Sequence, residues 1–163
     1  MAITDFMSAT YRYSAIALIA LVIWGCSDKP VSPEAQLRQT ISEAESSIKA
    51  RDLSATMAFI DAGYQDQNGF ELRQLRAMLA GYFLRHKSIF MLTKIENLEI
   101  VDEDKAKVLL FAGLAGSPQE NAPSLAAWRG DLIRLELKFI QQDDDWLLTQ
   151  ADWRRAGPED FIH

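Results

Sequence analysis

The hydrophobic residues in the first half of the chain recur at the spacing of an amphipathic helix. Ser32, Pro33 and Glu34 form a typical helix start, with an N-cap serine, a proline at the first helical position and an acid in the first turn. Apolar residues then follow at intervals of three and four: Leu37, Ile41, Ala44 and Ile48. The pattern predicts a helix that begins at Pro33 and ends near Arg51.

Two further helices are predicted before the pattern changes. The shorter covers Leu53–Ile60, and the longer covers about Phe70–His86, which carries a broad apolar stripe. The residues of the stripe are Leu72, Leu75, Leu79, Tyr82 and Phe83. Between these helices, the run from Ala62 to Gly69 is rich in turn-forming residues, so it is predicted to be a break between elements.

From Ile89 onward the hydrophobic period changes from 3.6 residues to 2, which is typical of strands. The predicted strands are 89–100, 106–115, 131–142 and 146–154, with turns at 102–105 and 143–145 and a loop at 116–127. We expect these strands to pair as an antiparallel meander. The fold class is therefore α+β, with the N-terminal helices packed on one face of the sheet.

An uncharged stretch from Ser14 to Trp24 precedes this domain. It is shorter than the roughly 20 apolar residues of a membrane-spanning helix, and it has the length of the core of a secretory signal. The next residues complete the sequence Ile23-Trp24-Gly25-Cys26, which resembles the lipobox of bacterial lipoproteins. The resemblance implies cleavage after Gly25 and lipidation of Cys26, which is the only cysteine of the chain.

This resemblance sets the expected organisation and location of the chain. We expect a signal peptide over 1–25, a lipidated tether over 26–32, a domain over 33–156 and a C-terminal tail over 157–163. The lipid would attach the protein to a membrane of the bacterial cell envelope. Because Ser27 follows the cysteine directly, resemblance to enterobacterial sorting favours the periplasmic side of the outer membrane.

The charge of the chain limits its partners. The net charge is −6, and removal of residues 1–25 leaves it unchanged because they contain one acid and one base. Nucleic-acid binding depends largely on neutralising phosphates, so we expect no nucleic-acid partner. An anionic membrane surface would not attract this domain either, so the lipid on Cys26 must supply the attachment to the membrane.

Three features, in their order along the chain, resemble the nuclear transport factor 2-like superfamily over roughly residues 34–155. They are a long helix that ends in Leu79-Ala-Gly-Tyr-Phe-Leu-Arg-His86 and leads into a strand, the turn and strand of Asp102–Ala115, and a final hairpin from Asp131 to Trp146-Leu-Leu-Thr-Gln-Ala-Asp-Trp153. The resemblance implies a cone, with the helices in the hollow of a strongly curved antiparallel sheet. It implies no single function, because the superfamily includes isomerases, dehydratases, ligand-binding domains and interaction modules.

The candidate ligand-binding residues are Tyr64, Tyr82, Trp128 and Arg134. In the ketosteroid-isomerase branch the resemblance would imply an aspartate base with a tyrosine partner, and Asp61 and Asp66 lie near Tyr64 in the sequence. No motif assigns any of these residues a catalytic role, and Tyr82 is better explained as a core residue with its hydroxyl satisfied. Trp128 is explained either as an anchor of its loop or as a contact residue at the mouth of the cone.

Metal and cofactor chemistry have little support in the sequence. His86 and His163 are the only histidines, and His86 is explained by its place at the C-terminus of a helix. No glycine-rich phosphate loop or nucleophile elbow is found. We therefore expect no metal, no cofactor and no catalytic residues.

Two expectations concern the sheet. Trp146 and Trp153 are seven residues apart, so in a regular strand they would face opposite sides. The first two strands carry apolar residues on both faces, with Phe90, Leu92, Leu109 and Phe111 on one of them. We expect that outer face to be partly covered, most simply by a second copy of the chain.

The sequence thus favours an envelope lipoprotein, anchored through Cys26, whose cone binds a partner protein or a small apolar ligand without catalysis. The alternative is an acid–base enzyme, resembling an isomerase or dehydratase, that acts on a small apolar substrate inside the cone. A purely structural role in the envelope is a third possibility.

Overall fold

A computed structural model describes residues 31–116, 130–157 and 160. The chain divides into two compact units, residues 1–31 and 32–163, and all the elements given below belong to the second. The expected signal peptide and Cys26 lie outside the described residues. Among the helices that are described, none is long and apolar enough to cross a membrane.

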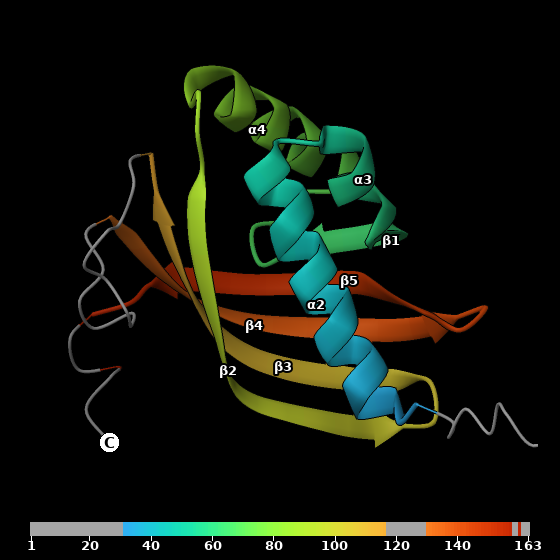
Figure 1. The fold of residues 1–163 in the computed structure, drawn as a ribbon. Helices are drawn as coiled ribbons and strands as arrows, with labels where there is room; N and C mark the ends of the chain where they lie inside the picture. Colours follow the sequence, from blue (N-terminus) through green and yellow to red (C-terminus); the bar gives the residue numbers. More distant parts are fainter. Residues whose placement is uncertain (1–30, 117–129, 158–159, 161–163) are drawn as a thin grey trace, which may run out of the picture. The chain divides into compact units, whose positions relative to one another are not determined.

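The second unit is an α+β domain, as predicted. Its elements are α2 (Pro33–Ala50), α3 (Leu53–Ala58), β1 (Ile60–Asp66), α4 (Leu72–Arg85), β2 (Phe90–Asp102), β3 (Lys105–Ala115), β4 (Asp131–Gln142) and β5 (Asp145–Arg155). The strands form one five-stranded sheet in the order β1-β5-β4-β3-β2. Figure 1 shows the sheet curving around α2, with α3 and α4 beside it.

Local hydrogen bonds explain where the first helices begin and end. The side chain of Ser32 accepts a hydrogen bond from the Ala35 N–H at 3.2 Å, which confirms the predicted N-cap of α2. Arg51 ends the same helix in the left-handed region, with φ of 59°. Asp52 then caps α3 by accepting from the Ala55 N–H at 2.9 Å.

The predicted break after α3 is partly wrong, because Ile60–Asp66 forms the strand β1. This strand pairs in parallel with β5, so the sheet is not the purely antiparallel meander that was expected. The pairing is irregular between Ile60 and Gln65, although the apolar residues Ile60, Ala62 and Tyr64 alternate along the strand. Only the end of the expected break is a tight turn, with Gly69 at φ of 78°.

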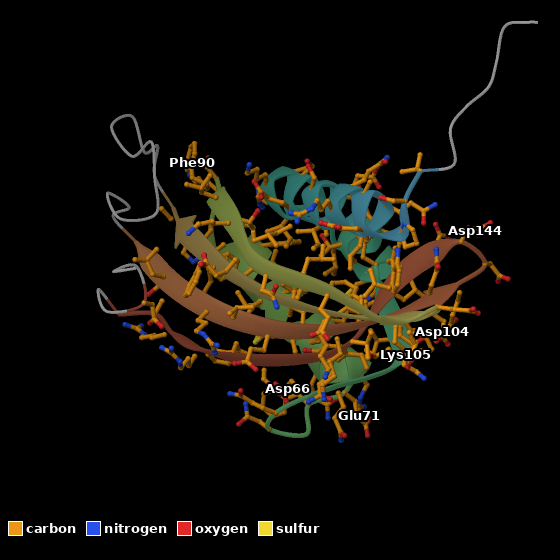
Figure 2. The ribbon with its side chains drawn as sticks, turned by 90° about the horizontal axis from the view of Figure 1, so that it is seen from below. Asp66, Glu71, Phe90, Asp104, Lys105 and Asp144 are labelled. Carbon is orange, nitrogen blue, oxygen red and sulfur yellow. The ribbon has the colours of Figure 1, made fainter. Side chains whose placement is uncertain are left out.

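The hairpin turns were predicted correctly. Gln142 pairs with Asp145 across a two-residue turn, in which Asp143 and Asp144 have φ of 49° and 69°. Positive φ at both central residues is the type I′ geometry that suits the twist of a β-hairpin. Figure 2 shows that Asp144 and Asp104, from the β2–β3 turn, lie at the same end of the sheet.

A β-bulge in β5 overturns the prediction for the two tryptophans. Lys138 pairs with Gln150 and Phe139 pairs with Leu148, so Thr149 has no partner in β4. Its hydroxyl donates to the Lys138 carbonyl at 3.1 Å. The extra residue shifts the alternation by one, and Trp146 and Trp153 both face the helices.

The core lies between the helices and the concave face of the sheet. Trp146, which is 1% exposed, packs there with residues of α2, β3 and β4. The other residues of this core include Leu37, Ile41, Val108, Leu110, Leu137 and Phe139. Burial of such large apolar side chains is the main contribution to the stability of a domain of this size.

The outer face of the sheet is partly covered within the single chain. Phe111, on the side of β3 away from the helices, is only 3% exposed. Leu92 and Leu109 are half-buried on the same face. A two-fold contact with a second copy at this face stays a prediction.

Candidate functional site

A cavity of about 420 Å³ lies between the helices and the concave face of the sheet. Its walls are mostly aliphatic and aromatic side chains from α2, α4, β3 and β4. They include Ile41, Leu75, Leu79, Leu110, Leu114, Ile133, Leu135 and Phe139. A cavity of this size and lining is typical of small-molecule sites, which measure roughly 300–1,000 Å³.

Strand alternation places these side chains in the cavity. In β4, the odd-numbered residues from Ile133 to Phe139 face the helices, and in β3 the even-numbered residues from Leu110 to Leu114 do so. Ala112, in the middle of β3, has a small side chain and leaves space at the floor of the cavity. The predicted period-2 pattern of β4 is confirmed here.

Tyr64 lies in the cavity wall and is 4% exposed. Burial raises the pKa of its hydroxyl to about 12, with further contributions from the negative charges of Asp66 and Asp152. No described residue forms a hydrogen bond with this hydroxyl. The phenol therefore stays protonated at neutral pH and is available to a bound molecule.

Tyr82 lines the same cavity from α4. Burial raises the pKa of its hydroxyl, and the charge of Asp131 adds to the effect. Its ring lies 4.3 Å from that of His86, centroid to centroid, with the planes tilted by 34°. His86 ends α4, as predicted, and supports the tyrosine from outside the cavity.

The aspartates near Tyr64 are held by loop hydrogen bonds. Asp66 Oδ1 accepts from the N–H groups of Asn68 at 2.7 Å and Phe70 at 2.8 Å. Asp61 accepts from the Gly63 N–H at 2.8 Å and is absent from the cavity wall. Figure 2 shows Asp66 at the loop that links β1 to α4. Both aspartates shape the β1 region, which accounts for them without a catalytic role.

The other two candidate residues are not brought beside the tyrosines. Arg134 lies on the outer face of β4, where its guanidinium forms an ion pair with Glu136. Trp128 lies outside the described residues. Within the described part of the chain, no three histidine, cysteine or acidic side chains come together in a way that could hold a metal ion.

Two residues at the edge of the cavity were not among the sequence candidates. Met78 and Trp153 line the cavity, yet they are 48% and 41% exposed. Large apolar side chains that are both exposed and part of a cavity wall mark its opening to solvent. Trp153 was missed because the bulge at Thr149 turns it toward the helices.

A second hollow, an open groove of about 770 Å³, lies between β1 and the start of α4. Arg73 and Arg76 line it from the helix, and Gly63 and Gln65 line it from the strand. Tyr64 borders both the groove and the cavity. The groove is much more polar than the cavity, and it is open along β1.

No family model matches the sequence, and no curated protein is similar to it. Solved structures do resemble the domain. A putative dehydratase of the NTF2-like family from Streptomyces avermitilis has a TM-score of 0.58 and 14% identity, and the match covers 76% of this chain and 96% of that one. A ketosteroid isomerase-like protein from Erwinia carotovora atroseptica has a TM-score of 0.52 and 11% identity, over 77% and 97% of the two chains.

A longer protein also contains a similar domain. Bd1075 from Bdellovibrio bacteriovorus has a TM-score of 0.58 and 11% identity, and the match covers 74% of this chain but only 40% of Bd1075. At such low identities the comparisons establish the architecture and no activity. The domain has the NTF2-like fold, in which helices lie in the hollow of a curved sheet.

Proposed function

We propose that this domain binds a small, mainly apolar molecule in its cavity, without catalysis, while lipid on Cys26 holds it at a bacterial envelope membrane. The observation that supports binding is the cavity of about 420 Å³, with its apolar walls and an opening beside Met78 and Trp153. Apolar burial would supply most of the affinity, and the two tyrosines would orient the ligand.

The polar groups favour binding over acid–base catalysis. An acid or base works best when its pKa lies near the working pH, whereas the pKa of Tyr64 is about 12. Asp66, the cavity-wall carboxylate whose charge adds to the raised pKa of Tyr64, already accepts hydrogen bonds from two backbone N–H groups. An isomerase- or dehydratase-like activity remains the alternative, and the unpaired phenol of Tyr64 is its best candidate group.

The membrane anchor is supported by the sequence Ile23-Trp24-Gly25-Cys26. In a bacterial host fed a labelled fatty acid, the full chain should take up label and sediment with membranes. The Cys26→Ser variant should do neither. Equal labelling of both chains would contradict the anchor and would leave the binding proposal intact.

Binding is best tested by filling the cavity. We would titrate the full chain with N-phenylnaphthylamine, a neutral apolar dye whose fluorescence rises in apolar surroundings. The Ala112→Leu variant adds a larger side chain at the cavity floor, and Ala77→Leu makes the same change on the exposed side of α4. We expect at least tenfold weaker binding for Ala112→Leu and no change for Ala77→Leu.

A second variant that fills the cavity keeps the test valid if Ala112→Leu does not fold. Leu79→Phe enlarges a side chain on the opposite wall, in α4, and circular dichroism would check that both variants are folded. If the dye binds all four proteins equally, or binds none, the cavity is not a ligand site. Native mass spectra of the protein from an envelope extract would then reveal whether a natural ligand of a few hundred daltons is present.

A further inference from the structure

The charged side chains in the cavity wall all carry the same sign. Within the described ranges, Glu45, Asp66 and Asp131 line the cavity, and no lysine, arginine or histidine does. The three carboxylates come from α2, the end of β1 and the start of β4. They are therefore distributed around an apolar space, and a ligand would meet negative charge from several directions.

The threonine hydroxyls of the wall are already used by the protein. Thr40 donates to the Gln36 carbonyl at 3.2 Å, and Thr56 donates to the Asp52 carbonyl at 2.7 Å. Thr93 donates to the carboxylate of Glu45. The hydroxyls of Tyr64 and Tyr82 remain for a ligand, together with the unused lone pairs of the carboxylates, each of which can accept about four hydrogen bonds, so acceptors predominate.

The cations paired with these carboxylates lie toward solvent. Lys49 pairs with Glu45, and the highly exposed Arg155 lies 3.3 Å from Asp131. Asp66 is held by neutral N–H groups. The Glu45 side chain is only 16% exposed, whereas that of Asp131 is 63% exposed. Solvent and salt screen exposed charges much more than buried ones, so Glu45 is the main source of negative potential inside the cavity.

Both tyrosines respond to this potential. Asp66 contributes to the raised pKa of Tyr64, and Asp131 contributes to that of Tyr82. In each case burial is the larger cause, and both causes oppose the formation of a negative charge at the phenol oxygen. A carboxylate of a ligand placed beside these hydroxyls would meet the same two penalties.

We infer that the cavity selects apolar ligands with a neutral or cationic head group, such as a long-chain alcohol or amine, and rejects a fatty carboxylate of equal length. An alcohol can donate to the carboxylates and accept from the phenols. An ammonium group gains attraction from the carboxylates. The carboxylate of a fatty acid would lose its hydration on entering the cavity, and no cationic side chain in the described wall would pair with it. Burying an unpaired charge in this way is costly. This inference rests on the proposed binding function.

The test compares three ligands that differ only in their head groups. Dodecanol, dodecylamine and dodecanoate would each compete with N-phenylnaphthylamine for the full chain at pH 7.4 and physiological salt, below their micelle concentrations. We expect dodecanol and dodecylamine to displace the dye at concentrations at least tenfold lower than dodecanoate. Equal or tighter binding of dodecanoate would overturn the inference while confirming that the cavity binds apolar chains.

A matched pair of variants separates the cavity from the overall charge of the protein. Glu45→Gln removes a charge from the cavity wall at a side chain that is 16% exposed, and Glu99→Gln removes one from an exposed position on the outer side of β2. The ratio between the displacing concentrations of dodecanoate and dodecanol should fall in the first variant and stay unchanged in the second. An equal fall of this ratio in both variants would show that the net charge of the protein, and not the cavity wall, disfavours dodecanoate. If no ligand displaces the dye, or no dye binds, the proposed function itself fails.

Discussion

The side-chain amide of Gln67 replaces a strand partner for the backbone of Trp153. Gln67 Nε2 donates to the Trp153 carbonyl at 2.8 Å, and the Trp153 N–H donates to Gln67 Oε1, also at 2.8 Å. The two bonds continue the pairing of β1 with β5 beyond Asp66, where β1 ends. They hold the part of β5 that places Trp153 at the opening of the cavity.

Replacing Gln67 should therefore loosen this edge of the domain. Gln67→Ala removes both hydrogen bonds, and we expect the free energy of unfolding to fall by about 1 kcal/mol, since each bond contributes about 0.5–1.5 kcal/mol and these are exposed. Urea denaturation measures the change. Gln39→Ala, which removes a single bond to Glu43 on the exposed side of α2, is the control. Equal effects in the two variants would show that the amide pairing adds nothing.

Arg51 should link the ends of two helices. Its guanidinium donates to the Phe83 carbonyl at 3.1 and 2.8 Å and to the Lys87 carbonyl at 3.2 Å, next to the C-terminus of α4. Arg51→Ala should lower the free energy of unfolding by about 2 kcal/mol, because it removes charge-assisted hydrogen bonds.

Arg51→Gly separates the side chain from the backbone. Glycine adopts the φ of 59° without strain, so this variant should be more stable than Arg51→Ala by about 0.5–1 kcal/mol. It should remain less stable than the natural protein. A glycine variant as stable as the natural protein in chemical denaturation would mean that the guanidinium bonds contribute little.

The turn between β4 and β5 leaves room for stabilisation. Asp143 and Asp144 occupy a type I′ turn that strongly favours Asn-Gly. The double variant Asp143→Asn, Asp144→Gly should raise the free energy of unfolding by about 1 kcal/mol and shift the thermal midpoint upward. Asp104→Asn, in the other hairpin turn of this end, removes a charge without relieving positive φ and should have a smaller effect. An unchanged midpoint in the double variant would argue against the turn geometry.

Tyr64 should make stability depend on pH in the alkaline range. Its pKa rises from 10 in the unfolded chain to about 12 in the folded domain, mainly because it is buried. Below pH 10 both states are protonated, and above it only the unfolded state loses the proton. Stability should therefore fall as pH rises from 10 to 12, by up to about 2–3 kcal/mol from this residue. The loss should be smaller in Tyr64→Phe, and denaturation curves of the two proteins that stay parallel from pH 9 to 12 would contradict the assignment.

Local patterns predicted most of the fold, while long-range pairing set the rest. The N-cap at Ser32, the period of β4 and the acidic turn at Asp143 each depend on neighbouring residues, and all three are found. The strand β1 was missed because its partners in β5 lie 85 to 88 residues away in the sequence and pair with it irregularly. Ile60, Ala62 and Tyr64 do alternate along it, but the glycine and polar residues around them favour a turn.

The candidate site shows the same division. Tyr64 and Tyr82 were selected by residue type, and the structure places both in one cavity wall. Met78 was overlooked because exposure at an opening depends on the packing of α4 against the sheet. The uniform sign of the cavity charges was also beyond prediction, because Glu45, Asp66 and Asp131 meet only in three dimensions.

The unpaired Thr149 has a consequence for evolution and for sequence alignment. In a regular strand, inserting or deleting one residue moves every later side chain to the opposite face of the sheet. In β5 the extra residue Thr149 has this effect on the residues that follow it. In a related chain without the bulge, the aromatic residue that faces the helices would lie one position earlier than Trp153 does here. It would then lie an even number of positions after the counterpart of Trp146. Correct alignment of the last strand therefore requires a gap at position 149, and a gapless match would equate a residue at the cavity opening with one that faces away from it.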